Sequence, residues 1–160
     1  DTGDSTAWFG RVFRPANQRA IISGKWRTMG FALPAAIAAK IHSPNSPVVA
    51  IAGDGGFTMT FAEFITAIKY ELPIVVVVLN NGCLAMEKNR MLMENLQPLG
   101  TDLLNPDFAG FANICGGVGI KVDNVEQLDR ALTEGLKSQK PVIIDVNTSA
   151  IEVPGASMPS

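Results

Sequence analysis

Two apolar runs rich in β-branched residues constrain the fold of this 160-residue chain more than any other feature. They occupy residues 48–53 and 74–79 and show no alternation of apolar and polar side chains. Such runs are typical of parallel strands covered on both faces of a sheet. Between them lie apolar residues at helical spacing, namely Phe61, Phe64, Ile65 and Ile68. Pro73 ends that helix, so the segment predicts a strand–helix–strand unit.

The same alternation of strand and helix extends over the rest of the chain. The expected elements are helices over residues 30–41, 106–115 and 125–136, and strands over residues 119–122 and 141–146. Asn105 and Pro106 are expected to be the N-cap and the first residue of the second of these helices. The pattern predicts an α/β fold, a three-layer doubly wound and mostly parallel sheet with helices on both faces. We expect one domain over residues 1–160, with a flexible tail at 152–160.

The composition argues against several classes of protein. Hydrophobic residues make up 47% of the chain and charged residues 18%, which favours a packed globular domain over disorder. The net charge is only -2 and no basic stripe is present, so nucleic acid is not an expected partner. Membrane association is not indicated, because the run at 74–79 is too short to cross a bilayer.

The two cysteines and the first residue suggest a setting for the chain. Cys83 and Cys115 belong to no CxxC or Cys/His cluster, which argues against a zinc site or a disulfide scaffold and favours a cytoplasmic location. The chain starts at Asp1 without a methionine. We therefore expect a fragment, or a separate subunit, of a larger enzyme.

The loops after the two central strands carry polar residues suited to a metal and a phosphate group. Asp54 follows the first strand, and Asn80 and Asn81 follow the second, so these loops are expected at the same edge of the sheet. A carboxylate, an amide oxygen and a backbone carbonyl form a sparse oxygen site that suits Mg²⁺ with phosphate and water. Three glycines would let the backbone approach a diphosphate at a helix N-terminus: Gly53, Gly55 and Gly56.

The spacing of these motifs resembles that of one enzyme family. Residues 53–58 lack the third glycine of a dinucleotide-binding loop, and the chain has no Walker A motif. GDGG followed after 23 residues by NN resembles the diphosphate-binding domain of thiamine diphosphate enzymes. SGKWRTMGFALPAAIAAK from Ser23, NPDF at 105–108 and PVIIDV at 141–146 extend the resemblance. It is most similar to the C-terminal domain of pyruvate oxidases and of the related acetolactate synthases and decarboxylases.

The resemblance implies thiamine diphosphate and Mg²⁺ as cofactors, with Asp54, Asn81 and the carbonyl of Cys83 as metal ligands. Met29 would support the bent cofactor, and backbone groups near Arg27 and Met29 would hold its aminopyrimidine ring. A methionine beside a glycine-rich turn is also a common gap-filler in a core. Six further residues are implied as cofactor contacts: Gly3, Asp4, Ser5, Leu84, Ala85 and Met86.

Two side chains near the metal site have alternative interpretations. The thiol of Cys83 is either a passive small side chain or a nucleophile, and no histidine lies near it in the sequence. Glu87, three residues before Arg90, lies either on a solvated helix face or beside the substrate as an acid. The order of charges from Glu87 to Arg90 differs from the pyruvate oxidase pattern, which leaves the substrate open.

The resemblance also implies partners for this chain. The activating glutamate of the family has no match here, so the chain is expected to be inactive alone and to pair with the pyrimidine-binding domain of a neighbouring subunit. A homo-oligomer, a small 2-oxo acid substrate such as pyruvate, and FAD on an absent domain are further expectations. The alternatives are an acetolactate synthase or 2-oxo acid decarboxylase subunit, or a non-catalytic pairing or regulatory domain.

Overall fold

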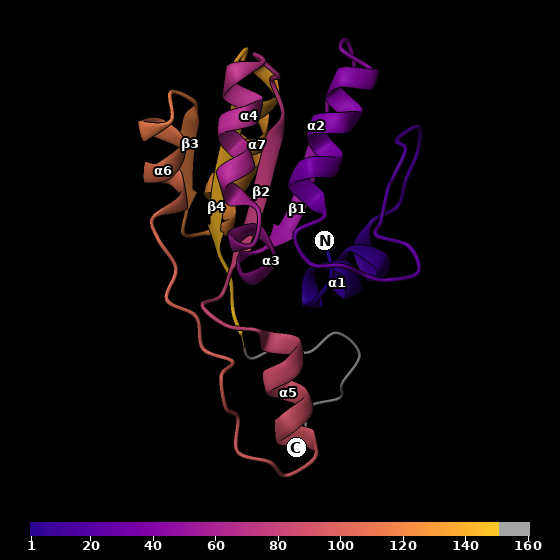
Figure 1. The fold of residues 1–160 in the computed structure, drawn as a ribbon, viewed down its shortest axis with the longest axis vertical. Coiled ribbons are helices and arrows are strands. Elements are labelled where there is room, and N and C mark those ends of the chain that lie inside the picture. Colours follow the sequence, from indigo (N-terminus) through magenta and orange to yellow (C-terminus); the bar gives the residue numbers. More distant parts are fainter. Residues whose placement is uncertain (151–160) are drawn as a thin grey trace.

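Four parallel strands in the order β1-β2-β4-β3 form the centre of the computed structural model, which describes residues 1–150 (Figure 1). The strands are β1 Val49–Gly53, β2 Val75–Asn80, β3 Val118–Val122 and β4 Val142–Asn147. All three pairings between neighbouring strands are parallel. The α/β fold with a parallel sheet is thereby confirmed, whereas the tail expected at 152–160 lies outside the described residues.

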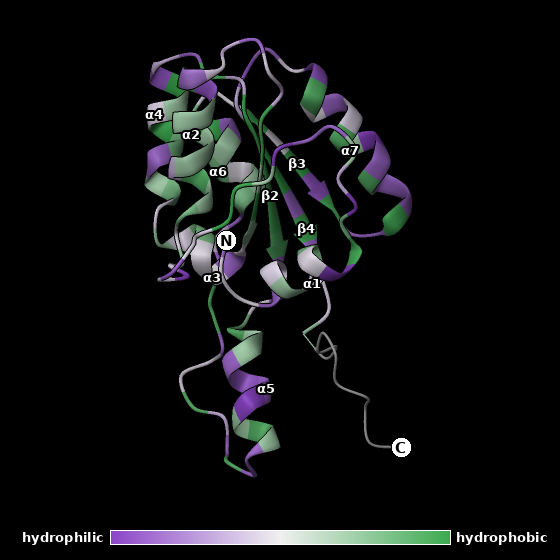
Figure 2. Ribbon diagram, turned by 90° about the vertical axis from the view of Figure 1, so that its right-hand side faces the viewer, coloured by the Kyte–Doolittle hydropathy of each residue, from purple (hydrophilic) through white to green (hydrophobic). Residues whose placement is uncertain are grey.

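Helices cover both faces of the sheet. The helical elements are α1 Asp4–Val12, α2 Ala32–His42, α3 Asp54–Thr58, the 3₁₀ turn η1 Phe61–Glu63, α4 Phe64–Lys69, α5 Ala85–Met93, α6 Phe108–Ile114 and α7 Val125–Lys137. Figure 2 shows α2, α4 and α6 on one side of the strands and α7 on the other, which confirms the three layers. Within residues 1–150, no helix combines the length and the apolar character needed to span a membrane.

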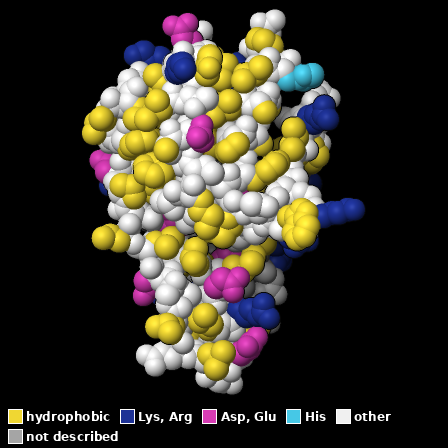
Figure 3. Space-filling model, in the orientation of Figure 1, with side chains coloured by type: hydrophobic (Ala, Val, Ile, Leu, Met, Phe, Trp, Pro, Cys, Tyr) yellow, Lys and Arg dark blue, Asp and Glu magenta, His cyan; other side chains and the backbone are white. Residues whose placement is uncertain are grey.

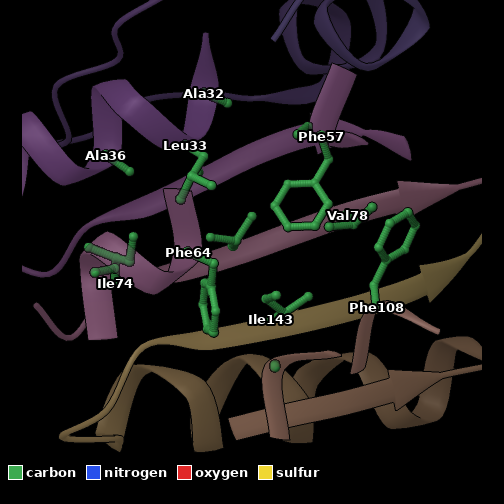
Figure 4. Close-up of a cluster of buried hydrophobic side chains, with 14 of the residues drawn as sticks. Ala32, Leu33, Ala36, Phe57, Phe64, Ile74, Val78, Phe108 and Ile143 are labelled. Carbon is green, nitrogen blue, oxygen red and sulfur yellow. The ribbon is translucent and has the colours of Figure 1, made fainter. Parts of the chain in front are cut away.

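The alternating side chains of β2 explain why its sequence shows no alternation of polarity. Val76 and Val78 pack with buried aromatic residues on the face covered by α2, α4 and α6 (Figure 4). Val75 and Val77 pack on the opposite face in the cluster that includes Ala131 of α7. Since successive side chains of a strand point to opposite faces, both sets must be apolar when both faces are covered.

The helix expected between the first two strands is shorter than predicted and differently oriented. The structure places η1 and then α4 there, and Phe64 is fully buried whereas Ile65 is 55% exposed. The inward face of α4 therefore runs through Phe64 and Ala67. The helix ends before Glu71, whose φ of 49° is left-handed, and Pro73 follows before β2. The apolar spacing detected the helix but did not decide which residues face the sheet.

The predicted N-cap at Asn105 is wrong. Helix α6 begins at Phe108, and its N-cap is Asp107, whose side chain accepts a hydrogen bond from the backbone N–H of Gly110 at 3.0 Å. Aspartate and asparagine are about equally good N-caps, so the local sequence offered both. Asp107 takes the capping role because the Asn105 side chain is hydrogen-bonded elsewhere, to Asp54 at the start of α3.

Helix α6 packs so closely on β3 that Gly119 has no room for a side chain. A methyl group at Gly119 would overlap the backbone of Ala109. We therefore expect Gly119→Ala to lower the free energy of unfolding by about 3 kcal/mol, because the obstructing atoms belong to the backbone. Gly10→Ala is the control, since a methyl group there meets no atom within 4 Å. Urea unfolding followed by circular dichroism measures both, and equal stability of the two variants would contradict the tight packing.

Candidate functional site

The strands run toward α5, so their carboxyl ends lie at the edge of the sheet from which α5 projects (Figure 2). Asp54 starts α3 directly after β1, and Asn81 follows β2. The Asp54 carboxylate is only 3% exposed and accepts hydrogen bonds from the backbone N–H groups of Gly55 at 2.9 Å and Gly82 at 2.8 Å. Gly82 reaches it with a left-handed φ of 71°, which glycine adopts without strain. This carboxylate therefore joins the loops after the two central strands.

A third segment reaches the same carboxylate through Asn105. Its side-chain Nδ2 donates to Asp54 Oδ2 at 2.7 Å and to Asn80 Oδ1 at 2.9 Å. The Asn80 amide in turn donates to Asp145 Oδ1 on β4 at 3.0 Å. The sequence pattern does not predict such a role for Asn105 or Asp145. The signal for Asn105 in the sequence is its place in the NPDF motif, where it predicts an N-cap.

The donor atoms at this edge fit a hard divalent ion. The described hydrogen bonds fill two lone-pair positions on Asp54 Oδ2 and one on Oδ1, so Oδ1 keeps one position for a metal. The Asn81 Oδ1 atom accepts from the Cys83 N–H at 3.1 Å and also keeps a lone pair. Across residues 1–150, no three His, Cys, Asp or Glu side chains converge on a possible metal position. A mixed oxygen set with a single carboxylate suits Mg²⁺ that retains phosphate and water ligands.

The loop that holds Cys83 is tied on both sides. The Gly82 carbonyl accepts from the Leu103 N–H at 2.8 Å, and the Leu84 N–H donates to the Thr101 carbonyl at 2.7 Å. The first bond fixes the peptide group before Cys83, and the second fixes the peptide group that contains the Cys83 carbonyl. Burial raises the pKa of the Cys83 thiol, opposed by the charge of Lys88. A neutral buried thiol fits the passive interpretation of this side chain better than the nucleophilic one.

The glycine-rich turn is lined by side chains from distant segments. A methyl group at Gly55 would lie 2.6 Å from Leu84 Cδ2 and 3.5 Å from Met29 Cε, so both side chains reach the turn. The Ser5 hydroxyl is buried and has no hydrogen-bond partner among the described residues. A methyl group at Gly53 would lie 3.9 Å from it. An unpaired buried hydroxyl beside a glycine turn fits a ligand with acceptor oxygens, such as a diphosphate.

The N-terminal segment and the segment around Met29 are held together. The Asp1 carboxylate accepts from the backbone N–H groups of Gly30 at 3.0 Å and Phe31 at 3.2 Å. Gly3 is the N-cap of α1, and Asp4 and Ser5 are its first residues, so these two residues lie in a helix. Burial raises the pKa of the Asp4 carboxyl.

No described hydrogen bond joins the remaining predicted contact residues to the Asp54 carboxylate. Arg27 is exposed and has a left-handed φ of 46°. Ala85 is the buried first residue of α5, and Met86 beside it is 42% exposed. Glu87 is exposed on α5, and Arg90 pairs with Glu94 at 3.3 Å. No described contact joins Glu87 to the residues around Asp54, so its role as a substrate-side acid stays a prediction.

A polar cavity of about 380 Å³ lies beside the Asp54 cluster at the same edge of the sheet. Its lining includes Asn80, Asn105, Asp107, Lys121, Asp145 and Asn147. Burial raises the pKa of the Asp145 carboxyl, and the hydrogen bond from Asn80 opposes that shift. Asn105, Asn80 and Asp145, which are linked by hydrogen bonds to one another and through Asn105 to Asp54, therefore form part of the wall of this cavity.

Nearly the whole chain is similar to one family of known proteins. Residues 1–146 match the model of the family described as "Thiamine pyrophosphate enzyme, C-terminal TPP binding domain". The chain is 44% identical over 147 residues to YdaP of Bacillus subtilis, a protein whose name gives thiamine pyrophosphate as an inferred component. It is 35% identical over 147 residues to an acetolactate synthase of Bacillus subtilis. It is 36% identical over 151 residues to the large subunit of acetolactate synthase isozyme 3 of Escherichia coli.

These similarities span nearly all of this chain but only part of each relative. The alignments cover 91%, 91% and 90% of the chain and 26% of each relative. The chain thus spans about a quarter of the length of the curated relatives it matches.

Proposed function

The chain belongs to the thiamine pyrophosphate enzymes, as a C-terminal TPP-binding domain, and we propose that it binds the cofactor through Mg²⁺ held by Asp54, Asn81 and the Cys83 carbonyl. The hydrogen bond from the Gly82 N–H to the Asp54 carboxylate carries this proposal. It joins the start of α3 to the loop after β2, so that oxygens of Asp54, Asn81 and Cys83 would bind one ion at this edge of the sheet.

Several residues of this chain would bind the cofactor around that ion. The Gly56 N–H near the start of α3 and the unpaired Ser5 hydroxyl would donate to the diphosphate, whereas the Gly55 N–H already donates to Asp54. Met29 and Leu84, whose side chains reach Gly55, would exclude water from the same turn. When bound, thiamine diphosphate supplies the nucleophilic carbon and the electron sink for decarboxylating a 2-oxo acid. The remaining contacts proposed from the family resemblance are Gly3, Asp4, Arg27, Gly53, Gly56, Ala85 and Met86.

Two reactions of a pyruvate-type 2-oxo acid are candidates for the complete enzyme. The relatives described above include two acetolactate synthases, which supports the condensation reaction. The sequence pattern alone favoured a pyruvate oxidase, and that oxidation, with FAD on another domain, stays a prediction. Product analysis separates them, because the first reaction yields acetolactate and the second transfers electrons to an acceptor.

The proposed partner is the pyrimidine-binding domain of a neighbouring subunit, in a homo-oligomer in the cytoplasm. Large apolar side chains are exposed on two segments that would contact it. They include Ile21, Ile22, Trp26, Leu92, Met93, Leu96 and Leu99. On the face shown in Figure 3, apolar side chains lie among charged ones on the lower projection that carries α5. Burial of such side chains against a partner is favourable.

The isolated chain is expected not to consume pyruvate at a measurable rate, because it lacks the activating glutamate of the family. Adding the pyrimidine-binding domain should give consumption that requires both thiamine diphosphate and Mg²⁺. Pyruvate loss and product formation are measured with and without a chelator. Robust consumption of pyruvate by the 160 residues alone would contradict the prediction that the chain needs an activating glutamate from another domain. Cofactor-independent behaviour of the assembled protein would instead favour a non-catalytic pairing domain.

A further inference from the structure

The Asp54 carboxylate is held asymmetrically by its neighbours. Its Oδ2 atom accepts two hydrogen bonds, from the Gly82 N–H at 2.8 Å and from Asn105 Nδ2 at 2.7 Å. Its Oδ1 atom accepts one described bond, from the Gly55 N–H at 2.9 Å. An ionised carboxylate has about four acceptor positions, two on each oxygen. The Gly82 N–H and Asn105 together therefore fill both positions on Oδ2, so a second bond from Asp54 to a metal ion would need one of these donors to be removed.

The orientation of the Asn105 amide is itself determined by a chain of side chains. A carboxylate only accepts hydrogen bonds, so Asp145 turns the Nδ2 atom of Asn80 toward itself at 3.0 Å. The Oδ1 atom of Asn80 then faces Asn105 and accepts from its Nδ2 at 2.9 Å. Both hydrogens of the Asn105 amide are thereby committed, one to Asn80 and one to Asp54. The buried Asp145 on β4 thus determines which atom donates and which accepts in each of these three hydrogen bonds.

We propose that Asn105 is a positioning residue that makes Asp54 a one-oxygen ligand and so gives the site its preference for Mg²⁺ over Ca²⁺. This inference rests on the proposed function, since it takes Asp54 as a metal ligand. Mg²⁺ requires a near-octahedral arrangement of its ligands. Ca²⁺ takes six to eight oxygens in a more flexible geometry and accepts both oxygens of one carboxylate. A carboxylate that can bind a metal only through Oδ1 therefore suits Mg²⁺. A carboxylate that can bind through both oxygens suits Ca²⁺.

The test compares Asn105→Leu with the unchanged protein, assembled with its pyrimidine-binding domain. Leucine has a similar volume but no donor, so Oδ2 of Asp54 becomes available. Calorimetric titration with Mg²⁺ and with Ca²⁺, each at saturating thiamine diphosphate, gives two dissociation constants. The preference for Mg²⁺, expressed as the ratio of these constants, is expected to fall about tenfold. Asn147→Leu is the matched control, because Asn147 lines the same cavity from the end of β4 and is expected to leave the ratio unchanged.

The outcomes separate the inference from the proposed function. Equal weakening of both metals by Asn105→Leu, or an unchanged ratio, would mean that Asn105 only supports the loops and would overturn the inference. If Asp54→Ala leaves the dissociation constants of both metals unchanged, then Asp54 is not a metal ligand and the proposed metal site is refuted. If thermal unfolding shows that Asn105→Leu does not fold, Asn105→Ala takes its place. Alanine removes the amide donor without adding a charge or a new metal ligand, and the same fall in the ratio is expected.

Discussion

Replacing Asp54 with alanine is expected to weaken magnesium-dependent binding of thiamine diphosphate by about 100-fold, or about 3 kcal/mol. Asp54 is the only carboxylate of the proposed ligand set and is 3% exposed. Removing it would leave the proposed ion without a protein countercharge. The cofactor dissociation constant of the assembled protein is measured by calorimetry with Mg²⁺ and with a chelator.

The control for this variant is Asp123→Ala. Asp123 is an exposed carboxylate that follows β3 at the same edge of the sheet, so it tests the loss of negative charge there without the loss of a ligand. Its cofactor affinity should stay within about twofold of the parent, as expected for a solvent-exposed charge. The Asp54 carboxylate also accepts from Gly82 and Asn105, so thermal unfolding must show that Asp54→Ala is folded. A folded variant with parental affinity would refute Asp54 as a metal ligand.

Phe64→Ala is expected to lower the free energy of unfolding by about 3–5 kcal/mol, the range for a fully buried aromatic side chain. Phe64 is 0% exposed and belongs to the core between α4 and the sheet (Figure 4). Ile65→Ala is the matched control, one residue along the same helix and 55% exposed, with an expected loss of about 1 kcal/mol or less. Urea unfolding followed by circular dichroism measures both variants. Similar losses would show that the inward face of α4 is assigned incorrectly.

The strands that form the sheet were predictable from the sequence because their signal is local. The run at 74–79 contains no polar side chain, and β2 occupies Val75–Asn80 with both faces covered. Strand ends were also predictable, since glycine and acidic residues after such a run mark a loop. The placement of Asp54 at the carboxyl end of β1 follows from these two signals alone.

The inward face of α4 and the start of α6 were less predictable. Phe64 and Ile65 are both large and apolar, and only packing against the sheet buries the first and exposes the second. Asn105 and Asp107 are both good N-caps, and the choice between them depends on a contact with Asp54, 51 residues away in the sequence.

The sequence by itself determined the class of fold, the elements at the centre of the sheet and the two loops that carry Asp54 and Asn81. Only the tertiary structure decided the strand order β1-β2-β4-β3, which places Asp145 beside Asn80 across 65 residues of chain. The physical reason is the distance along the sequence over which each property is determined. Periodicity and turn chemistry are properties of neighbouring residues, whereas the hydrogen-bond partner of a buried amide depends on which distant strand packs beside it.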